Sequence, residues 1–142
     1  MQDLSRYPVI HPQSVAWGDM DAFGHVNNVH YYRYMESARI RYLDTLNILN
    51  QNVVTVVASN QCKYLRPVVY PDQLKVATRV EELRNSAFRM SYILWSETQE
   101  NIVATGDAVI VCVDNKTMQK TAIPEHIKNQ IRKLESTVEN NI

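Results

Sequence analysis

The stretch WGDMDAFGHVNNVHYYRYMESAR, residues 17–39, decides the fold and carries most of the candidate chemistry. Two carboxylates, Asp19 and Asp21, come first, and a glycine turn and two helix-capping asparagines follow them. The chain then has neither Pro nor Gly, which predicts a helix over about 28–46. Because the N-terminal end of a helix attracts negative charge, the motif places a carboxylate beside a natural site for a substrate oxygen.

The composition is that of one globular domain. A chain of 142 residues can bury its own core but is short for two domains, so residues 1–142 are predicted to form a single domain. Lys and Arg (15) balance Asp and Glu (15), which gives no reason to expect nucleic acid as a partner. We find neither a signal-peptide pattern nor an apolar run of about 18 residues that would predict a membrane span, and we expect a cytoplasmic protein.

The cysteines and histidines do not predict a metal site. Cys62 and Cys112 each lie in an apolar, strand-like run and are predicted to be reduced thiols in the core. The four histidines lack the spacing of metal ligands, and the chain has only three glycines and no phosphate-binding loop. Neither a metal nor a bound cofactor is expected.

Alternating apolar residues in the second half of the chain predict strands. We expect strands at 12–17, 53–58, 61–65, 73–83, 88–98 and 102–113, with Gly106 as a bulge in the last. Residues 1–10 are expected to form a loose lead-in. Pro124 is placed to open a short helix that ends near Leu134, and the polar tail from Glu135 is expected to fray. Short turns between strands predict an antiparallel sheet that covers the long helix.

The long helix is apolar on most sides when it is plotted at about 100° per residue, so its surroundings must wrap it. Its tyrosines are therefore expected to belong to the core. Glu36 and Arg39 lie away from the narrow polar stripe and are three residues apart, so they can form an ion pair. Because a buried charge needs a partner or a function, Glu36 is either half of an internal ion pair or a group at the substrate site.

Three motifs carry a family resemblance. GDMDAFGHVNNVHYYRYMESAR (18–39), CKYLRPVVYPDQL (62–74) and EELRNSAFRM (81–90) resemble, in the same order, motifs of the hotdog-fold acyl-CoA thioesterases of the 4-hydroxybenzoyl-CoA thioesterase superfamily. The resemblance implies an α+β hotdog fold, in which a curved, five-stranded antiparallel sheet wraps round one long central helix; the short C-terminal helix completes it. It also implies a homodimer or a homotetramer with active sites at the subunit interface.

By this resemblance the chain is an acyl-CoA thioesterase that hydrolyses a thioester to a free acid and CoA without a cofactor. Asp21 matches the family's catalytic carboxylate, which could act as a nucleophile or as a general base on water. Backbone amides at the helix start would hold the thioester oxygen and stabilise the oxyanion. Gly24 precedes the helix in this substrate-binding turn, and the side chains of Asn27 and Asn28 either cap the helix or contact the substrate.

Three further residues have roles that stay open. His25 matches a catalytic histidine of plant acyl-carrier thioesterases with this fold, but Phe23 replaces an asparagine of their motif, so His25 is either catalytic or only shapes the loop. Arg84 matches part of a basic turn that contacts CoA phosphates in some relatives. Arg66 is another candidate for that contact, although either arginine could be a solvated charge.

Two alternatives compete with the hydrolase. A non-catalytic acyl-CoA or acyl-carrier binding module of the same fold would keep the pocket and lose the base, so the presence of Asp21 argues against it. A hydratase or dehydratase would pair a histidine with a carboxylate, but its His-Phe-Pro signature is absent. Asp19 is expected to be a turn or cap acceptor and not a catalytic group.

Overall fold

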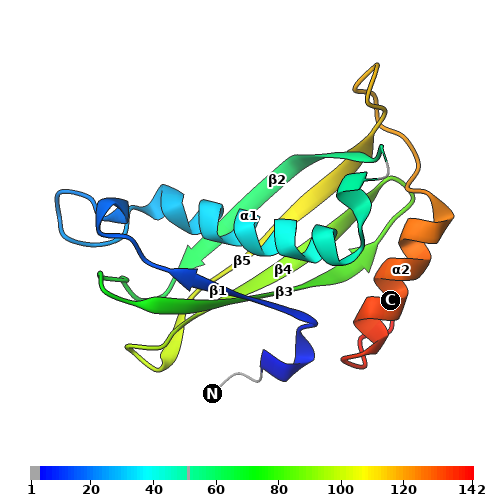
Figure 1. Cartoon of the computed structure of the whole chain (residues 1–142). Helices are drawn as coiled ribbons and strands as arrows, with labels where there is room; N and C mark the ends of the chain where they lie inside the picture. The colour runs from blue at the N-terminus through cyan, green and yellow to red at the C-terminus, as the bar shows by residue number, and fades with distance from the viewer. Residues whose placement is uncertain (1–3, 51) are drawn as a thin grey trace.

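The computed structural model describes residues 4–50 and 52–142 (Figure 1). The strands are β1 (Val9–Ser14), β2 (Val54–Tyr64), β3 (Gln73–Leu83), β4 (Ala87–Ser96) and β5 (Asn101–Val113), and the helices are α1 (Asn28–Thr45) and α2 (Glu125–Ser136). Short 3-10 turns lie at Leu4–Arg6, Trp17–Asp19 and Ile48–Asn50. Both predicted helices are confirmed to within about two residues at each end.

The five strands form one antiparallel sheet in the order β1-β3-β4-β5-β2. Short turns join β3 to β4 and β4 to β5, as predicted, whereas β2 crosses to the far edge and pairs with β5. The sheet curves around α1, which lies across one face, and α2 packs against β3 at one end (Figure 1). This is the expected α+β architecture of the hotdog fold, which is therefore confirmed.

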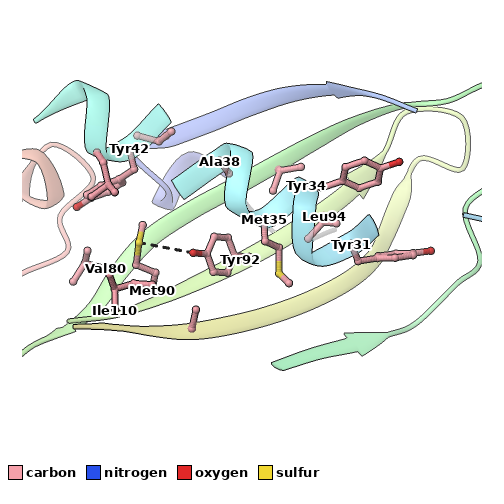
Figure 2. Packing of buried hydrophobic residues seen from close by; sticks show 14 of the residues in the cluster. Tyr31, Tyr34, Met35, Ala38, Tyr42, Val80, Met90, Tyr92, Leu94 and Ile110 are labelled. Carbon is pink, nitrogen blue, oxygen red and sulfur yellow. Dashed lines mark hydrogen bonds between the residues drawn. The ribbon is translucent and has the colours of Figure 1, made fainter. Parts of the chain in front are cut away.

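The core lies between α1 and the inner face of the sheet (Figure 2). The buried face of α1 includes Tyr31, Tyr34, Met35, Ala38 and Tyr42, and the sheet contributes, among others, Val80, Met90, Tyr92, Leu94 and Ile110. Burial of one large apolar side chain stabilises a fold by roughly 1.5–3 kcal/mol, so this face fixes the helix on the sheet. The opposite face is less enclosed in the single chain than the helical wheel suggests, because Val29 and Ile40 are exposed.

Gly106 does not form the predicted bulge. It pairs in regular register with Tyr92 of β4 and Cys62 of β2. A Cβ atom at this position would lie 2.6 Å from Sδ of Met35 and 2.7 Å from the backbone oxygen of Gln61. The missing side chain therefore allows α1 to approach the centre of the sheet closely. The register shifts occur instead in β2, in β3 and at Val103 of β5.

Two strand predictions need correction. β1 begins at Val9 and ends at Ser14, three residues earlier than the predicted strand. Tyr7, just before it, packs with Ala77 and Ile93 on the outer face of the sheet. The ring centroid of Tyr7 lies 4.9 Å from the guanidinium carbon of Arg79, so the loose lead-in predicted at 1–10 is wrong for residues 4–10, and residues 1–3 lie outside the described residues. The two strands predicted at 53–58 and 61–65 are one strand, β2, which tolerates a register shift between Val57 and Ser59.

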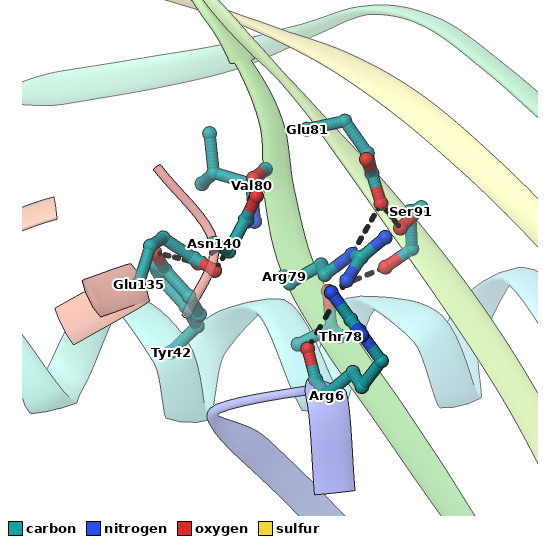
Figure 3. Close-up of polar contacts among 9 residues, drawn as sticks. All are labelled: Arg6, Tyr42, Thr78, Arg79, Val80, Glu81, Ser91, Glu135 and Asn140. Carbon is teal, nitrogen blue, oxygen red and sulfur yellow. Dashed lines mark hydrogen bonds and ion pairs between the residues drawn. The ribbon is translucent and has the colours of Figure 1, made fainter. Parts of the chain in front are cut away.

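A buried carboxylate holds the C-terminal segment, which was expected to fray (Figure 3). Glu135 is fully buried, and its Oε2 accepts hydrogen bonds from the Tyr42 hydroxyl (2.5 Å) and the Val80 amide (2.9 Å). Its Oε1 accepts a hydrogen bond from the side-chain amide of Asn140 (2.9 Å). Since β1 reaches only to Thr78 of β3, the Val80 amide has no strand partner on that side and is satisfied by Glu135 instead.

Candidate active site

The candidate site begins at the N-terminal end of α1. Asn27 caps the helix, because its Oδ1 accepts a hydrogen bond from the Val29 amide (3.1 Å). The first amides of a helix have no acceptor within it, and the aligned peptide dipoles give this end a positive partial charge. The first turn, from Asn28, can therefore bind a negatively charged oxygen.

A tight loop presents Asp21 beside this turn. The amide of Asp21 donates to the carbonyl of His25 (2.8 Å), and the amide of Gly24 donates to the carbonyl of Asp21 (3.0 Å). Gly24 has φ +81°, a backbone conformation that residues other than glycine rarely adopt. Oδ1 of Asp21 accepts one hydrogen bond, from the Phe23 amide (2.9 Å). The loop thus fixes the backbone of Asp21 and His25 side by side.

The opposite wall comes from the end of β2 and the segment after it. The amide of Val26 donates to the carbonyl of Val68 (2.8 Å) and joins the two segments. The hydroxyl of Tyr64 donates to the carbonyl of Asn28 (3.0 Å). The rings of Tyr31 and Tyr64 meet edge to face, with centroids 4.9 Å apart, so the helix start and the strand end form one rigid corner.

These segments line an open pocket of about 360 Å³. Its lining residues are Asp21, His25, Val26, Asn28, Tyr31, Tyr64, Leu65, Arg66 and Pro67. The structure therefore brings together four of the predicted site residues: Asp21, His25, Asn28 and Arg66. Polar groups at the helix start face an aromatic and aliphatic wall, an arrangement typical of sites that bind a small molecule with one polar and one apolar part.

Gly24 and Asn27 support this pocket without lining it, and two predicted residues lie elsewhere. Glu36 has a side chain that is 59% exposed and lines a separate groove of about 560 Å³ beside α1. The ion pair with Arg39 is present (3.9 Å), although the closer partner of Arg39 is the hydroxyl of Tyr92 (3.0 Å). The predicted ion pair is therefore present, but it is not internal, because only Arg39 is buried and the carboxylate of Glu36 is exposed.

Arg84 lies in the turn between β3 and β4, at the end of the sheet away from the pocket (Figure 1). Its guanidinium forms two hydrogen bonds with the carboxylate of Glu82 (2.9 and 3.0 Å). A further concavity of about 490 Å³ lies on the outer face of the sheet near Ser91 and Asp107. Both larger concavities lack the loop carboxylate and the first turn of α1, so the smaller pocket is the candidate active site.

Sequence reasoning missed the two aromatic residues of the pocket. Tyr31 was assigned to the core, and most of it is buried, but part of it faces the pocket. Tyr64 belongs to the 62–74 motif, but the sequence analysis gives it no role in the site. Its place directly before Leu65 and Arg66, where β2 ends, is the signal that could have identified it as a pocket residue.

Within residues 4–50 and 52–142, no three His, Cys, Asp or Glu side chains are grouped so that they could hold a metal ion. Neither α1 nor α2, nor any other helix in those ranges, is long and apolar enough to cross a bilayer. Cys62 and Cys112 are free thiols, and Cys112 is buried, as predicted.

The fold and the pocket together define a class of protein. The model of the Thioesterase-like superfamily matches residues 15–131, and the chain belongs to this superfamily. The matched segment contains the pocket, the long helix and four of the five strands. The resemblance seen in the three sequence motifs is thereby confirmed.

Individual relatives agree with this assignment. Protein YsmA of Bacillus subtilis is 35% identical over 106 residues, which cover 73% of this chain and 71% of the relative. The long-chain acyl-CoA thioesterase FadM of Escherichia coli is 25% identical over 119 residues, which cover 81% of this chain and 90% of the relative. A thioesterase of Thermus thermophilus, crystallised with coenzyme A and zinc, has a TM-score of 0.82 and 34% identity, covering 92% of this chain and 96% of that chain. The expectation of a thioester hydrolase is confirmed.

Proposed function

We propose that this chain hydrolyses acyl-CoA thioesters to a free acid and CoA in the pocket at the start of α1. The observation that carries the proposal is that Asp21 and the first turn of α1 line the same pocket. Thioester hydrolysis needs a group that attacks or activates water and donors that stabilise the oxyanion, and these are the two groups that meet here. Two relatives support the substrate class: FadM is a long-chain acyl-CoA thioesterase, and the Thermus thermophilus thioesterase was crystallised with coenzyme A.

The first turn of α1 would polarise the thioester. With the carbonyl oxygen near the amide of Asn28, the negative charge that develops in the tetrahedral intermediate lies at the positive end of the helix. Such a donor is typically worth about 10²–10³ in rate. Tyr64 supports this geometry, because its hydroxyl holds the Asn28 carbonyl at 3.0 Å.

Two routes are open to Asp21. As a general base it accepts a proton from water; the hydroxide adds to the carbonyl carbon, the intermediate collapses to the acid and the thiolate, and the thiolate takes the proton back from Asp21. As a nucleophile it forms a mixed anhydride and expels the thiolate, which takes a proton from water, and water hydrolyses the anhydride in a second step and restores the carboxylate. His25 lines the same pocket and would orient the water or the leaving group, or it would only shape the loop.

The remaining lining suggests how the substrate lies. Tyr31, Tyr64 and Leu65 would contact the acyl group, because they form the apolar wall. Arg66 is exposed at the same pocket and would attract the negatively charged CoA. An acyl-carrier thioester would present the same reacting bond. The pocket therefore supports thioester hydrolysis but does not distinguish CoA from an acyl carrier as the thiol.

A homodimer is part of the proposal. β2 is an edge strand with exposed apolar residues, Val56 and Val57, and unpaired edge strands are the usual place for strand-to-strand association. Pairing of two β2 strands would bring a second chain next to the pocket, and the predicted contacts of Glu36 and Arg84 would then have to cross this interface. A tetramer and a cytoplasmic location stay predictions.

The test is thiol release from a panel of acyl-CoA thioesters. Asp21→Asn should lower kcat/KM by about 10²–10⁴-fold, because it removes the base or nucleophile and leaves the size of the side chain unchanged. Asp114→Asn is the matched control, since Asp114 also accepts a hydrogen bond from the amide two residues later (2.9 Å) but lies in the turn after β5. Undiminished turnover in Asp21→Asn would refute the assigned role.

The same assay separates hydrolysis from binding alone. A non-catalytic acyl-CoA or acyl-carrier binding module would show saturable binding of the panel and no thiol release from the wild-type protein. A binding module could keep both Asp19 and the aromatic wall of the pocket. Turnover by the wild-type protein therefore decides between the two functions.

A further inference from the structure

Asp19 is the second carboxylate of the motif, and it does not line the pocket. Its side chain is 18% exposed, and Oδ2 accepts hydrogen bonds from the Tyr34 hydroxyl (2.6 Å) and the Ala16 amide (3.0 Å). Nδ1 of His30 lies 3.5 Å from Oδ1. The carboxylate therefore contacts the chain just after β1 and the first two turns of α1.

The backbone of Asp19 adds a further connection. Its carbonyl accepts the amide of Asn27 (2.9 Å), the residue that caps α1. Met20 and Val26 then form an isolated antiparallel bridge, and the tight turn with Asp21 follows directly. Asp19 is thus the last fixed point before the loop that presents the catalytic carboxylate, and the same residue holds the helix cap.

The link between Asp19 and Tyr34 is strong in chemical terms. Burial raises the pKa of the Tyr34 hydroxyl, and the neighbouring carboxylate raises it further, so Tyr34 remains a donor. Burial alone would raise the pKa of Asp19, but the hydrogen bonds from Tyr34 and Ala16 outweigh it and hold that pKa below its ordinary value. The contact is a charge-assisted hydrogen bond across the whole neutral range.

We propose that Asp19 is a positioning residue for the hydrolysis: through Tyr34 and the helix cap it fixes the loop of Asp21 against the first turn of α1. The inference rests on the proposed function. Catalysis depends on the distance between the attacking group and the polarised carbonyl, and a misplacement of about 1 Å can cost about 10²-fold in rate. A residue that holds both partners, and touches neither the substrate nor the reacting atoms, controls this distance.

The experiment compares two tyrosine hydroxyls on the same helix. Tyr34→Phe removes the hydrogen bond to Asp19, whereas Tyr42→Phe removes a hydrogen bond of similar length to Glu135 at the far end of α1. Both variants should lose stability. Only Tyr34→Phe should lower kcat, by about tenfold per folded molecule, with KM changed by less than about threefold. Asp19→Ala should lower kcat by about 10²-fold, and adding Tyr34→Phe to it should cause little further loss.

The outcomes keep the two proposals apart. If the wild-type protein releases thiol, Asp21→Asn does not, and Tyr34→Phe has the same kcat as Tyr42→Phe, the hydrolase stands and the positioning role is refuted. If the wild-type protein releases no thiol from any acyl-CoA, both proposals fall. Should Asp19→Ala fail to fold, Tyr34→Phe against Tyr42→Phe still decides the question.

Discussion

Glu135→Gln tests the network that holds the C-terminal segment. Three donors converge on this carboxylate: the hydroxyl of Tyr42, the amide of Val80 and the side-chain amide of Asn140 (Figure 3). A carboxylate accepts from all three. Glutamine has nearly the same shape but only one acceptor oxygen, and its NH₂ group would face at least one donor.

The size of the effect follows from the arrangement. If the glutamine oxygen takes the place of Oε2, Tyr42 and Val80 keep their acceptor, and the side-chain amide of Asn140 keeps only the Val80 carbonyl (2.8 Å). The reverse orientation takes the carboxylate acceptor away from both Tyr42 and Val80. A buried donor without a partner costs about 1–3 kcal/mol, so we expect a loss of about 2 kcal/mol in the free energy of unfolding. For a chain of this length that corresponds to a fall in Tm of about 6 °C.

Urea unfolding followed by circular dichroism measures this loss. Glu125→Gln is the control, because Glu125 lies on the same helix with a side chain that is 77% exposed, and it should change the free energy by less than about 0.5 kcal/mol. Thiol release per folded molecule should be unchanged in both variants. Equal unfolding midpoints for Glu135→Gln and Glu125→Gln would refute the reasoning, because the buried carboxylate would then contribute nothing beyond an exposed one.

Three further predictions concern stability. Gly106→Ala should cost about 1–3 kcal/mol in urea unfolding, because the new methyl group would meet Met35; an unchanged midpoint would contradict the close approach. Asn27→Ala should lose about 1 kcal/mol in the same experiment, and Asn27→Asp should restore the cap and most of the loss. Burial would raise the pKa of Glu81, but hydrogen bonds, chiefly from Arg79, hold it below 4.5, so its contribution is complete above that pH and is lost as the pH falls through the folded pKa. Glu81→Gln should therefore reduce the fall in Tm between about pH 6 and about pH 3.

Most of the fold could be predicted from patterns among neighbouring residues. The absence of Pro and Gly after Asn27, together with its capping chemistry, located α1 almost to the residue. Period-two alternation located β3, β4 and β5, because each has one face in the core and short turns join β3 to β4 and β4 to β5. Such features depend only on neighbours in the chain, so the sequence displays them directly.

Features that depend on distant partners were the ones missed. In the sequence, Glu135 looks like the start of a polar tail. In the structure, β1 ends opposite Thr78, so the buried amide of Val80 needs another acceptor, which Glu135 provides. Tyr7 reads as part of a lead-in, and its packing against the sheet is not encoded in periodicity. Gly106 reads as a bulge because sequence cannot show that Met35 approaches it from another element.

The site divides in the same way. Asp21, His25 and Asn28 are neighbours in one motif, so their joint placement was predictable from the turn and the helix start. Arg66 joined them because its motif follows a strand that ends beside the helix. Glu36 was a candidate because it lies off the polar stripe of the helix, and Arg84 because it matches a basic turn of relatives; within one chain neither reaches the pocket.

The position of β2 has a geometric consequence for the proposed homodimer. A two-fold axis between two copies of this strand makes them antiparallel, so the numbers of facing residues always add up to the same constant. Side chains alternate between the two surfaces of a sheet, and the pairing of Val57 with Ile110 of β5 fixes the surface to which Val57 points. Facing residues of the two copies must point to the same surface, so this constant can change only in steps of two. Since β2 runs directly into Leu65 and Arg66, the constant that the dimer selects also determines which groups of the second molecule stand opposite Asp21.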